Sequence, residues 1–212
     1  GYRMFECDAK LSADDVVFLM HDATLHRTTN GHGIGGDLNW QQLSQLDAGS
    51  WHSRNFSGEP LPTLANVAQF CIRNRYFLNI EIKPTPGIEY KTGEVVAREA
   101  AQIWQHEAVP PLLTSFQVDA LKGALKAAPH LPRGLLLNSL TEGWLKTAQS
   151  LECCAVVCLY ALWTTDTVKA VHDAGMKCLS YTVNDEWAAE HLLQLGTDGI
   201  ITDRVDVFSP AA

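Results

Sequence analysis

The chain has 212 residues, which suits one globular domain with a large buried core. Its formal net charge of −8 disfavours a nucleic-acid partner, because phosphate contacts need a basic surface. No apolar run approaches the roughly 20 residues that span a bilayer, so stable membrane insertion is not expected.

Short apolar runs rich in β-branched or aromatic residues recur along the chain, and we expect them to be strands. They cover residues 2–7, 16–20, 76–82, 112–115, 133–137, 155–159, 177–183 and 199–202. From residue 76 onward they alternate with helix-like segments, an order that builds a parallel sheet. The connection between the first two runs is too short for a helical crossover, which leaves a hairpin or a degenerate barrel step.

Three segments carry clear helix signals. Residues 63–74 place Leu64, Val67, Ala68, Cys71 and Ile72 on one face. Residues 164–175 begin with Thr and Asp capping residues and end at Gly175, and residues 184–196 repeat this pattern up to Gly196.

Residues 22–62 interrupt the alternation with a long segment rich in Gly, Asn, Ser and Trp. A loop of this length inside a domain is usually functional or disordered. Trp40, Trp51 and Phe56, with a helix-like stretch at 39–47, predict a small packed insert that covers the strand ends as a lid.

Polar residues follow the apolar runs at Asp8, His21, Lys83, Ser115, Asn184 and Asp203. In a (β/α) barrel, the carboxyl ends of the strands carry the active site. An open doubly wound sheet also binds ligands there, so these positions alone do not separate the two folds. A Gly-rich dinucleotide loop is absent from the sequence.

Two carboxylates lie in the first run, which otherwise looks buried. Glu6 and Asp8 are two residues apart, so a strand points both to one side and Cys7 to the other. Glu81 and Lys83 repeat this spacing. Three carboxylates from two strands make an oxygen site suited to Mg²⁺ or Ca²⁺, beside which Lys83 would contact an anionic oxygen. Taken singly, such a carboxylate pair is more often an ion pair or a sheet edge, and His21 is more often structural.

Together these stretches resemble a known family. "MFECDAKLSADDVVFLMHDATLHRTTNGHG", "LNIEIKP" and "YTVN…DGIITD" are similar to the glycerophosphodiester phosphodiesterase family, closest to its bacterial cytosolic members. The family pattern is matched at Glu6, Asp8, His21, Asp22, Leu25, Arg27, Thr28, Thr29, Glu81 and Lys83. The resemblance implies an α/β fold, a TIM-type (β/α)8 barrel formed by residues 1–212 with an insert at 22–62.

The resemblance also implies roles for single residues. Glu6, Asp8 and Glu81 would be the metal ligands, with Mg²⁺ or Ca²⁺ as the divalent cation. His21 would be one of two histidines acting as general acid and base. Lys83 would be catalytic and hold the phosphate, and Tyr181 would bind substrate. The implied reaction is hydrolysis of a small glycerophosphodiester to glycerol 3-phosphate and an alcohol, in the cytoplasm; the oligomeric state stays open.

The sequence departs from the family pattern at its start. Family members begin with a strand that ends in His-Arg-Gly, followed by a helix, and neither is present here. We therefore expect an N-terminally incomplete barrel, with one of the apolar runs outside the eight barrel strands. Such a chain should be a poor phosphodiesterase and should be unstable or self-associate.

Two other functions remain open. One is a phospholipase-type diesterase acting on lysophospholipid or phosphoinositide, with Trp40, Trp51 and Phe56 as an apolar rim. The other is a non-catalytic domain that binds metal or phosphodiester. The six cysteines show no metal-binding spacing and are expected to be free thiols in a reducing compartment.

Overall fold

The computed structural model describes residues 1–209 and contains all eight expected strands. The strands are β1 (Met4–Leu11), β2 (Val17–Leu19), β3 (Phe77–Ile82), β4 (Leu112–Ser115), β5 (Arg133–Leu137), β6 (Ala155–Leu159), β7 (Lys177–Tyr181) and β8 (Gly199–Ile200). The α-helices are α1 (Trp40–Leu43), α2 (Leu64–Asn74), α3 (Glu89–Ile103), α4 (Val118–Ala127), α5 (Trp144–Ser150), α6 (Thr165–Asp173) and α7 (Glu186–Leu195). Short 3-10 turns are η1 (Gly35–Asp37), η2 (Arg54–Phe56) and η3 (Tyr160–Leu162).

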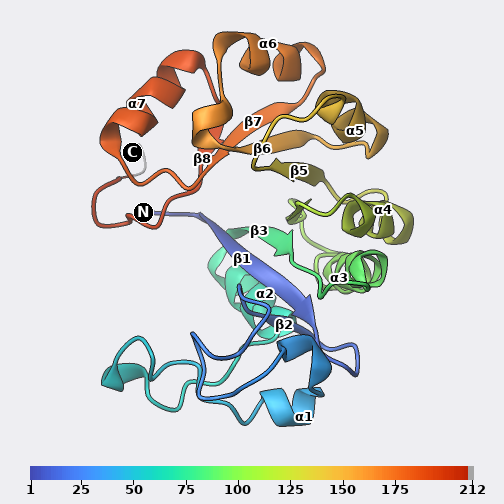
Figure 1. Ribbon diagram of the computed structural model, residues 1–212, viewed down its shortest axis with the longest axis vertical. Coiled ribbons are helices and arrows are strands. Elements are labelled where there is room, and N and C mark those ends of the chain that lie inside the picture. Colours follow the sequence, from blue (N-terminus) through green and yellow to red (C-terminus); the bar gives the residue numbers. More distant parts are fainter. Residues whose placement is uncertain (210–212) are drawn as a thin grey trace.

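The strands form one curled sheet in the order β2-β1-β3-β4-β5-β6-β7-β8. All neighbours from β1 to β8 are parallel, whereas β2 pairs antiparallel with β1, with Leu19 opposite Ala9. The connection left open by the sequence is therefore a hairpin, and β2 is the run outside the parallel series. Helices α2 to α7 cover the outer side of the sheet, as in a TIM-type α/β barrel that is open between β1 and β8 (Figure 1).

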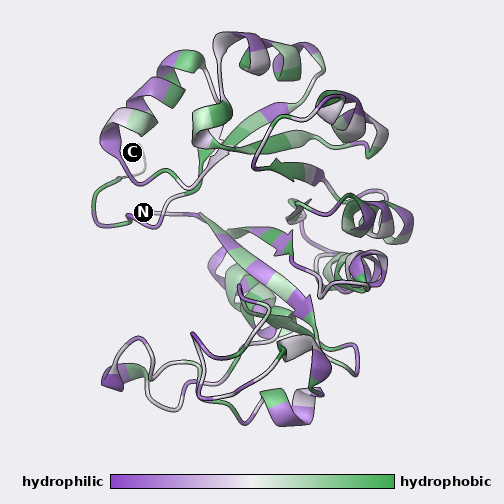
Figure 2. Ribbon diagram, in the orientation of Figure 1, coloured by the Kyte–Doolittle hydropathy of each residue, from purple (hydrophilic) through white to green (hydrophobic). Residues whose placement is uncertain are grey.

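The first half of β1 is exposed, which corrects the prediction of a buried strand. Met4 is 51% exposed and Phe5 is 41% exposed. The physical reason is that β2 pairs only with the last residues of β1, from Ala9 to Leu11, so Met4 to Asp8 have a strand neighbour on the β3 side alone. Hydrophilic residues also interrupt the ribbon of β1, whereas β5 and β6 are largely hydrophobic (Figure 2).

The helix boundaries follow the capping residues seen in the sequence. Thr63 caps α2 by accepting a hydrogen bond from the Asn66 amide, and Thr164 forms a capping box with Thr167 at the start of α6. Helix α7 ends at Gly196, whose φ of 81° is a left-handed conformation that glycine adopts without strain.

Residues 22–62, which we call the insert, share a small core with β2. Phe18 and Met20 pack there with Leu25, Leu43 and Leu61. Trp40 joins this core, its ring 6.4 Å from Phe18. The prediction was wrong for Trp51 and Phe56, which are 52% and 47% exposed, because their rings contact His52 in a surface loop and do not reach the core.

The structure also bears on the state of the cysteines and on membrane-spanning helices. All six cysteines lie in the described part of the chain, and all are free thiols. Within residues 1–209, no helix has both the length and the apolar character that crossing a membrane requires.

Candidate functional site

The three predicted metal ligands converge at the junction of β1 and β3. The register places Asp8 opposite Glu81, and the alternation of β1 turns Glu6 to the same side as Asp8. Cys7 faces the other way and packs against the core under α2. One carboxylate oxygen from each of the three residues lies within 4.8 Å of those of the others. The sheet thus brings together residues that are 73 positions apart in the chain.

The site carries more negative than positive charge. Loss of hydration, followed by repulsion from Asp8 and Glu81, raises the pKa of Glu6 to about 8. Burial also raises the pKa of Glu81, whose buried Oε1 accepts no hydrogen bond from the described residues. The Lys83 ammonium lies 3.3 Å from Asp8 Oδ1 and 3.4 Å from Glu81 Oε1. One ammonium does not balance three carboxylates, and this set of oxygen donors suits a hard divalent cation.

His21 reaches the site through the hairpin. Because β2 runs back along β1, the Met20 amide bonds to the Asp8 carbonyl at 3.0 Å, and the next residue is His21. Its Nδ1 lies 2.8 Å from Asp22 Oδ1. Arg27 donates to both Asp22 oxygens, at 2.6 and 2.9 Å. The hydrogen bonds from Arg27 and, to a lesser extent, from His21 hold the pKa of Asp22 well below its usual range. The ionised carboxylate only accepts, so Nδ1 carries the proton and Nε2 is left for other partners.

A cavity of about 650 Å³ lies at the carboxyl ends of the strands. Every residue predicted for the site lines it: Glu6, Asp8, His21, Glu81, Lys83 and Tyr181. The Tyr181 hydroxyl donates to the Leu137 carbonyl at 3.0 Å, and its ring packs edge-on against Phe116. The hydroxyl hydrogen of Tyr181 is therefore already used in a hydrogen bond. The side chain forms one wall of the cavity, and its hydroxyl oxygen can still accept a hydrogen bond.

Several residues that line the cavity were given no role from the sequence, although Arg27 matches the family pattern and Asp203 is one of the polar strand-end residues. They are Arg27, Asn79, Thr114, Phe116, Leu136, Thr182, Ile201 and Asp203. Asn79 lies two residues before Glu81, so strand alternation could have assigned it to the same face. Ser115, one of the polar strand-end residues, does not line the cavity, because it is buried and donates to the Ile82 carbonyl at 2.6 Å. Asn184 holds Asp203 by accepting its amide hydrogen at 3.0 Å.

A second group of side chains that could bind a metal ion was not predicted from the sequence: His172, Cys178 and Asp198. These residues lie at the end of α6, at the start of β7 and just before β8. No spacing motif connects them, so only the folded structure brings them together.

Comparison with known proteins decides the family. The model of the glycerophosphoryl diester phosphodiesterase family matches residues 1–207. The chain belongs to this family. A glycerophosphodiester phosphodiesterase of Caldanaerobacter subterraneus subsp. tengcongensis is 33% identical over 208 residues, which cover 96% of this chain and 83% of that protein. The expectation drawn from the sequence motifs is confirmed.

Solved structures agree with the family fold. An Oleispira antarctica phosphodiesterase in complex with the product sn-glycerol-3-phosphate is 30% identical, with a TM-score of 0.88, over 96% of this chain and 82% of that one. A glycerophosphodiester phosphodiesterase of Agrobacterium tumefaciens is 25% identical, with a TM-score of 0.80, over 97% of this chain and 86% of that one. The TIM-type fold expected for the family is therefore confirmed.

Proposed function

We propose that this chain hydrolyses glycerophosphodiesters to glycerol 3-phosphate and an alcohol with the help of a divalent cation. The observation that carries the proposal is the convergence of Glu6, Asp8, Glu81, Lys83 and His21 on one cavity. The product complex of the Oleispira relative supports the substrate class.

The metal ligands in this proposal are Glu6, Asp8 and Glu81, and the ion is Mg²⁺ or Ca²⁺, both of which prefer oxygen ligands. The bound ion offsets the charge of the phosphodiester and polarises its phosphorus–oxygen bonds. The crowding of three carboxylates around the single Lys83 ammonium fits such an ion.

Lys83 is proposed to hold a non-bridging phosphate oxygen. Its ammonium lies between Asp8 and Glu81 and also lines the cavity, so it is positioned before substrate arrives. A fixed point charge of this kind stabilises negative charge that grows on the phosphate during the reaction. Tyr181 is proposed to form the adjoining wall for the substrate.

His21 is proposed to transfer the proton. It would take a proton from the attacking hydroxyl or give one to the leaving alcohol oxygen through Nε2, while Nδ1 stays bonded to Asp22. Arg27 fixes Asp22 and thereby the ring orientation. In this proposal residues 22–62 are an insert in a single domain of residues 1–212, and they supply Arg27 to the cavity lining and Asp22 to the His21 ring.

A second candidate substrate class is lysophospholipid. The exposed Trp51 and Phe56 favour it, because aromatic side chains on a surface loop can contact acyl chains. Replacing both with serine should lower turnover of a long-chain lysolipid and leave turnover of glycerophosphocholine unchanged.

The deciding experiment is an assay of glycerol 3-phosphate release from glycerophosphocholine and glycerophosphoethanolamine. Release should require Mg²⁺ or Ca²⁺ and should be lost in the Lys83→Ala variant, with Lys91→Ala, outside the cavity, as the matched control. A chain that binds the cation and the product but releases glycerol 3-phosphate no faster than its Lys83→Ala variant would contradict the proposal and support a binding domain.

A further inference from the structure

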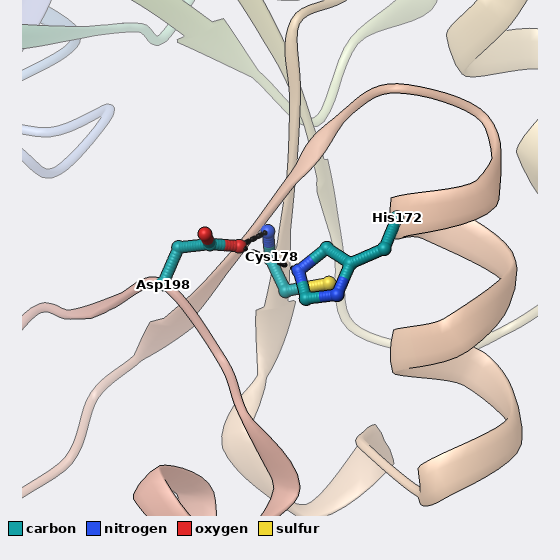
Figure 3. A group of neighbouring side chains, drawn as sticks. All are labelled: His172, Cys178 and Asp198. Atoms are coloured by element: carbon teal, nitrogen blue, oxygen red, sulfur yellow. Dashed lines mark hydrogen bonds and ion pairs between the residues drawn. The ribbon is translucent and has the colours of Figure 1, made fainter.

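A second cluster of metal-type ligands lies at the opposite end of the strands from the cavity. His172 comes from the last turn of α6, Cys178 from the start of β7, and Asp198 from the turn before β8. Figure 3 shows the three side chains directed toward one another. One donor atom from each, a nitrogen, a sulfur and an oxygen, lies within 4.8 Å of the other two.

The contacts hold these donors in place. Asp198 Oδ2 lies 2.8 Å from His172 Nε2 and accepts the Cys178 amide hydrogen at 2.8 Å, while Oδ1 accepts from the Lys177 ammonium at 2.8 Å. The side chains of His172 and Asp198 are 38% and 20% exposed, whereas Cys178 is fully buried. An ion arriving from solvent would therefore meet the imidazole and the carboxylate first and the sulfur beneath them.

We propose that His172, Cys178 and Asp198 bind one divalent transition-metal ion of the zinc class. Zn²⁺ takes imidazole nitrogen, thiolate sulfur and carboxylate oxygen in tetrahedral sites, with water in the remaining position. Mg²⁺ and Ca²⁺ avoid thiolates, so this site differs in metal class from the carboxylate site of Glu6, Asp8 and Glu81.

Binding requires a local rearrangement, in which the Cys178 thiol gives up its contact with the Val168 carbonyl and its sulfur approaches the other two donors. Two ligands about 2.0–2.1 Å from a tetrahedral ion lie about 3.3 Å apart, so His172 Nε2 and Asp198 Oδ2 must separate slightly from their present 2.8 Å. The thiol of Cys178 loses its proton to solvent and forms the sulfur–metal bond. Because the ionised Asp198 carboxylate only accepts, Nε2 of His172 carries the ring proton before metal binds. On binding, Nε2 loses that proton to solvent and bonds to the metal, and Nδ1 takes up a proton from solvent, so the ring stays neutral. Lys177 stays on Oδ1 and partly neutralises the carboxylate.

The expected consequence is structural. The ion would join the end of α6 to the starts of β7 and β8, which are otherwise connected there by hydrogen bonds. Because the unfolded chain lacks the arranged site, binding should raise the thermal unfolding temperature in proportion to the logarithm of the free ion concentration.

Cobalt substitution tests the proposal without reference to catalysis. The full chain is freed of metal with a chelator and titrated with Co²⁺, and the near-ultraviolet charge-transfer band between thiolate and cobalt is followed. The carboxylate site cannot produce this band, because it contains no sulfur. We expect the band to saturate at one equivalent, to vanish in Cys178→Ser and to persist in Cys154→Ser, which removes an exposed thiol outside the cluster.

His172→Ala provides a second variant at a partly exposed position, where loss of folding is not expected. It should weaken Co²⁺ binding by at least about tenfold, since even supporting groups around a metal contribute that much. A wild-type chain without the band, or a band of equal strength in Cys178→Ser, would overturn the proposal. So would unchanged Co²⁺ affinity in folded His172→Ala.

Discussion

Glu81 is the residue whose chemistry depends most on a bound cation. Its Oε1 is buried beside two other carboxylates and pairs with the Lys83 ammonium, 3.4 Å away, which Asp8 shares. Glu81→Gln keeps the shape but removes one charged ligand. We expect the cation concentration needed for half-maximal turnover to rise at least about tenfold. The free energy of unfolding without metal should change little, because the relief of repulsion from Asp8 offsets the lost ion pair with Lys83.

The matched control is Glu99→Gln, which changes a half-buried carboxylate of α3 outside the cavity. Cation dependence of turnover and urea denaturation in a chelator are the two measurements. If Glu81→Gln unfolds at lower urea while its cation dependence is unchanged, the carboxylate is structural.

His21 is the proposed proton carrier, and its replacement should affect turnover alone. In a chain that also carries the family's His-Arg-Gly strand, His21→Ala should lower turnover by roughly 10²–10⁴-fold, the usual contribution of a general acid or base. Cation binding, measured by calorimetry, should hardly change, since the three carboxylates remain. His26→Ala, at an exposed histidine of the insert, should retain turnover. Near-normal turnover in His21→Ala would exclude this role.

At the scale of elements, helices α3 and α4 pack unusually closely because glycines lie between them. A Cβ at Gly93 would overlap the carbonyl of Ala120, and one at Gly123 would overlap that of Tyr90. Alanine normally stabilises a helix interior relative to glycine, but here the overlap with backbone dominates. Gly93→Ala should lower the free energy of unfolding by about 1–3 kcal/mol.

Urea denaturation measures this effect, with Gln102→Ala at an exposed position of α3 as the control. If Gly93→Ala unfolds at a higher urea concentration than the wild-type chain, α3 and α4 can move apart to accept the added methyl group without loss of stability.

The loop of the insert between Asp47 and Gly58 is held by one carboxylate. Asp47 accepts hydrogen bonds from the Ser50 hydroxyl and from the amides of Ser50, Gly49 and Gly58, and these donors hold its pKa well below the usual 3.8. A lowered pKa means that the folded loop favours the ionised form. Its contribution is therefore complete above pH 3.8 and is lost as pH falls below that value.

Hydrogen exchange of the Gly49, Ser50 and Gly58 amides tests this assignment. Their protection factors should fall on acidification, and Asp47→Ala should lower them at neutral pH. Asp37→Ala, at another exposed aspartate of the insert, should not. Equal protection in Asp47→Ala and wild type would assign the order of the loop to other contacts.

The strands and helices that could be predicted from the sequence are those whose formation depends on residues close together in the chain. Alternation of apolar residues located the strands, and Thr63 and Thr164 marked helix starts because capping depends only on neighbours. The direction of β2 was not predictable, because a short connection fits more than one pairing. Exposure of Trp51 and the meeting of His172 with Asp198 depend on long-range packing, which spacing does not encode.

At the scale of the whole molecule, the described sheet is open between β1 and β8. A cavity of about 370 Å³ lies between them, lined largely by apolar side chains that include Met4, Phe5, Ile200 and Val205. Unpaired strand edges of this kind favour association with other chains. We expect the 212-residue chain to self-associate as its concentration rises.

Met4→Lys should reduce this association, because a charge on an exposed edge opposes strand pairing. Phe56→Lys is the control, since it removes an exposed aromatic side chain from the insert that does not line the cavity at the open edge. Sedimentation velocity over a concentration series distinguishes the two variants. A wild-type chain that remains monomeric throughout, or equal effects of both variants, would contradict the assignment.

The hairpin of β1 and β2 also determines where changes in chain length can be tolerated. The turn is closed by the Ser12 amide on the Val16 carbonyl, and Asp15 takes a φ of 65° within it. Since strand side chains alternate, gaining or losing one residue in this turn would shift the register of β2 and turn His21 away from Asp8. The insert begins after His21, so its surface loops can lengthen or shorten without moving that histidine. Length variation among functional descendants of this chain should therefore accumulate in the insert and be absent from the turn.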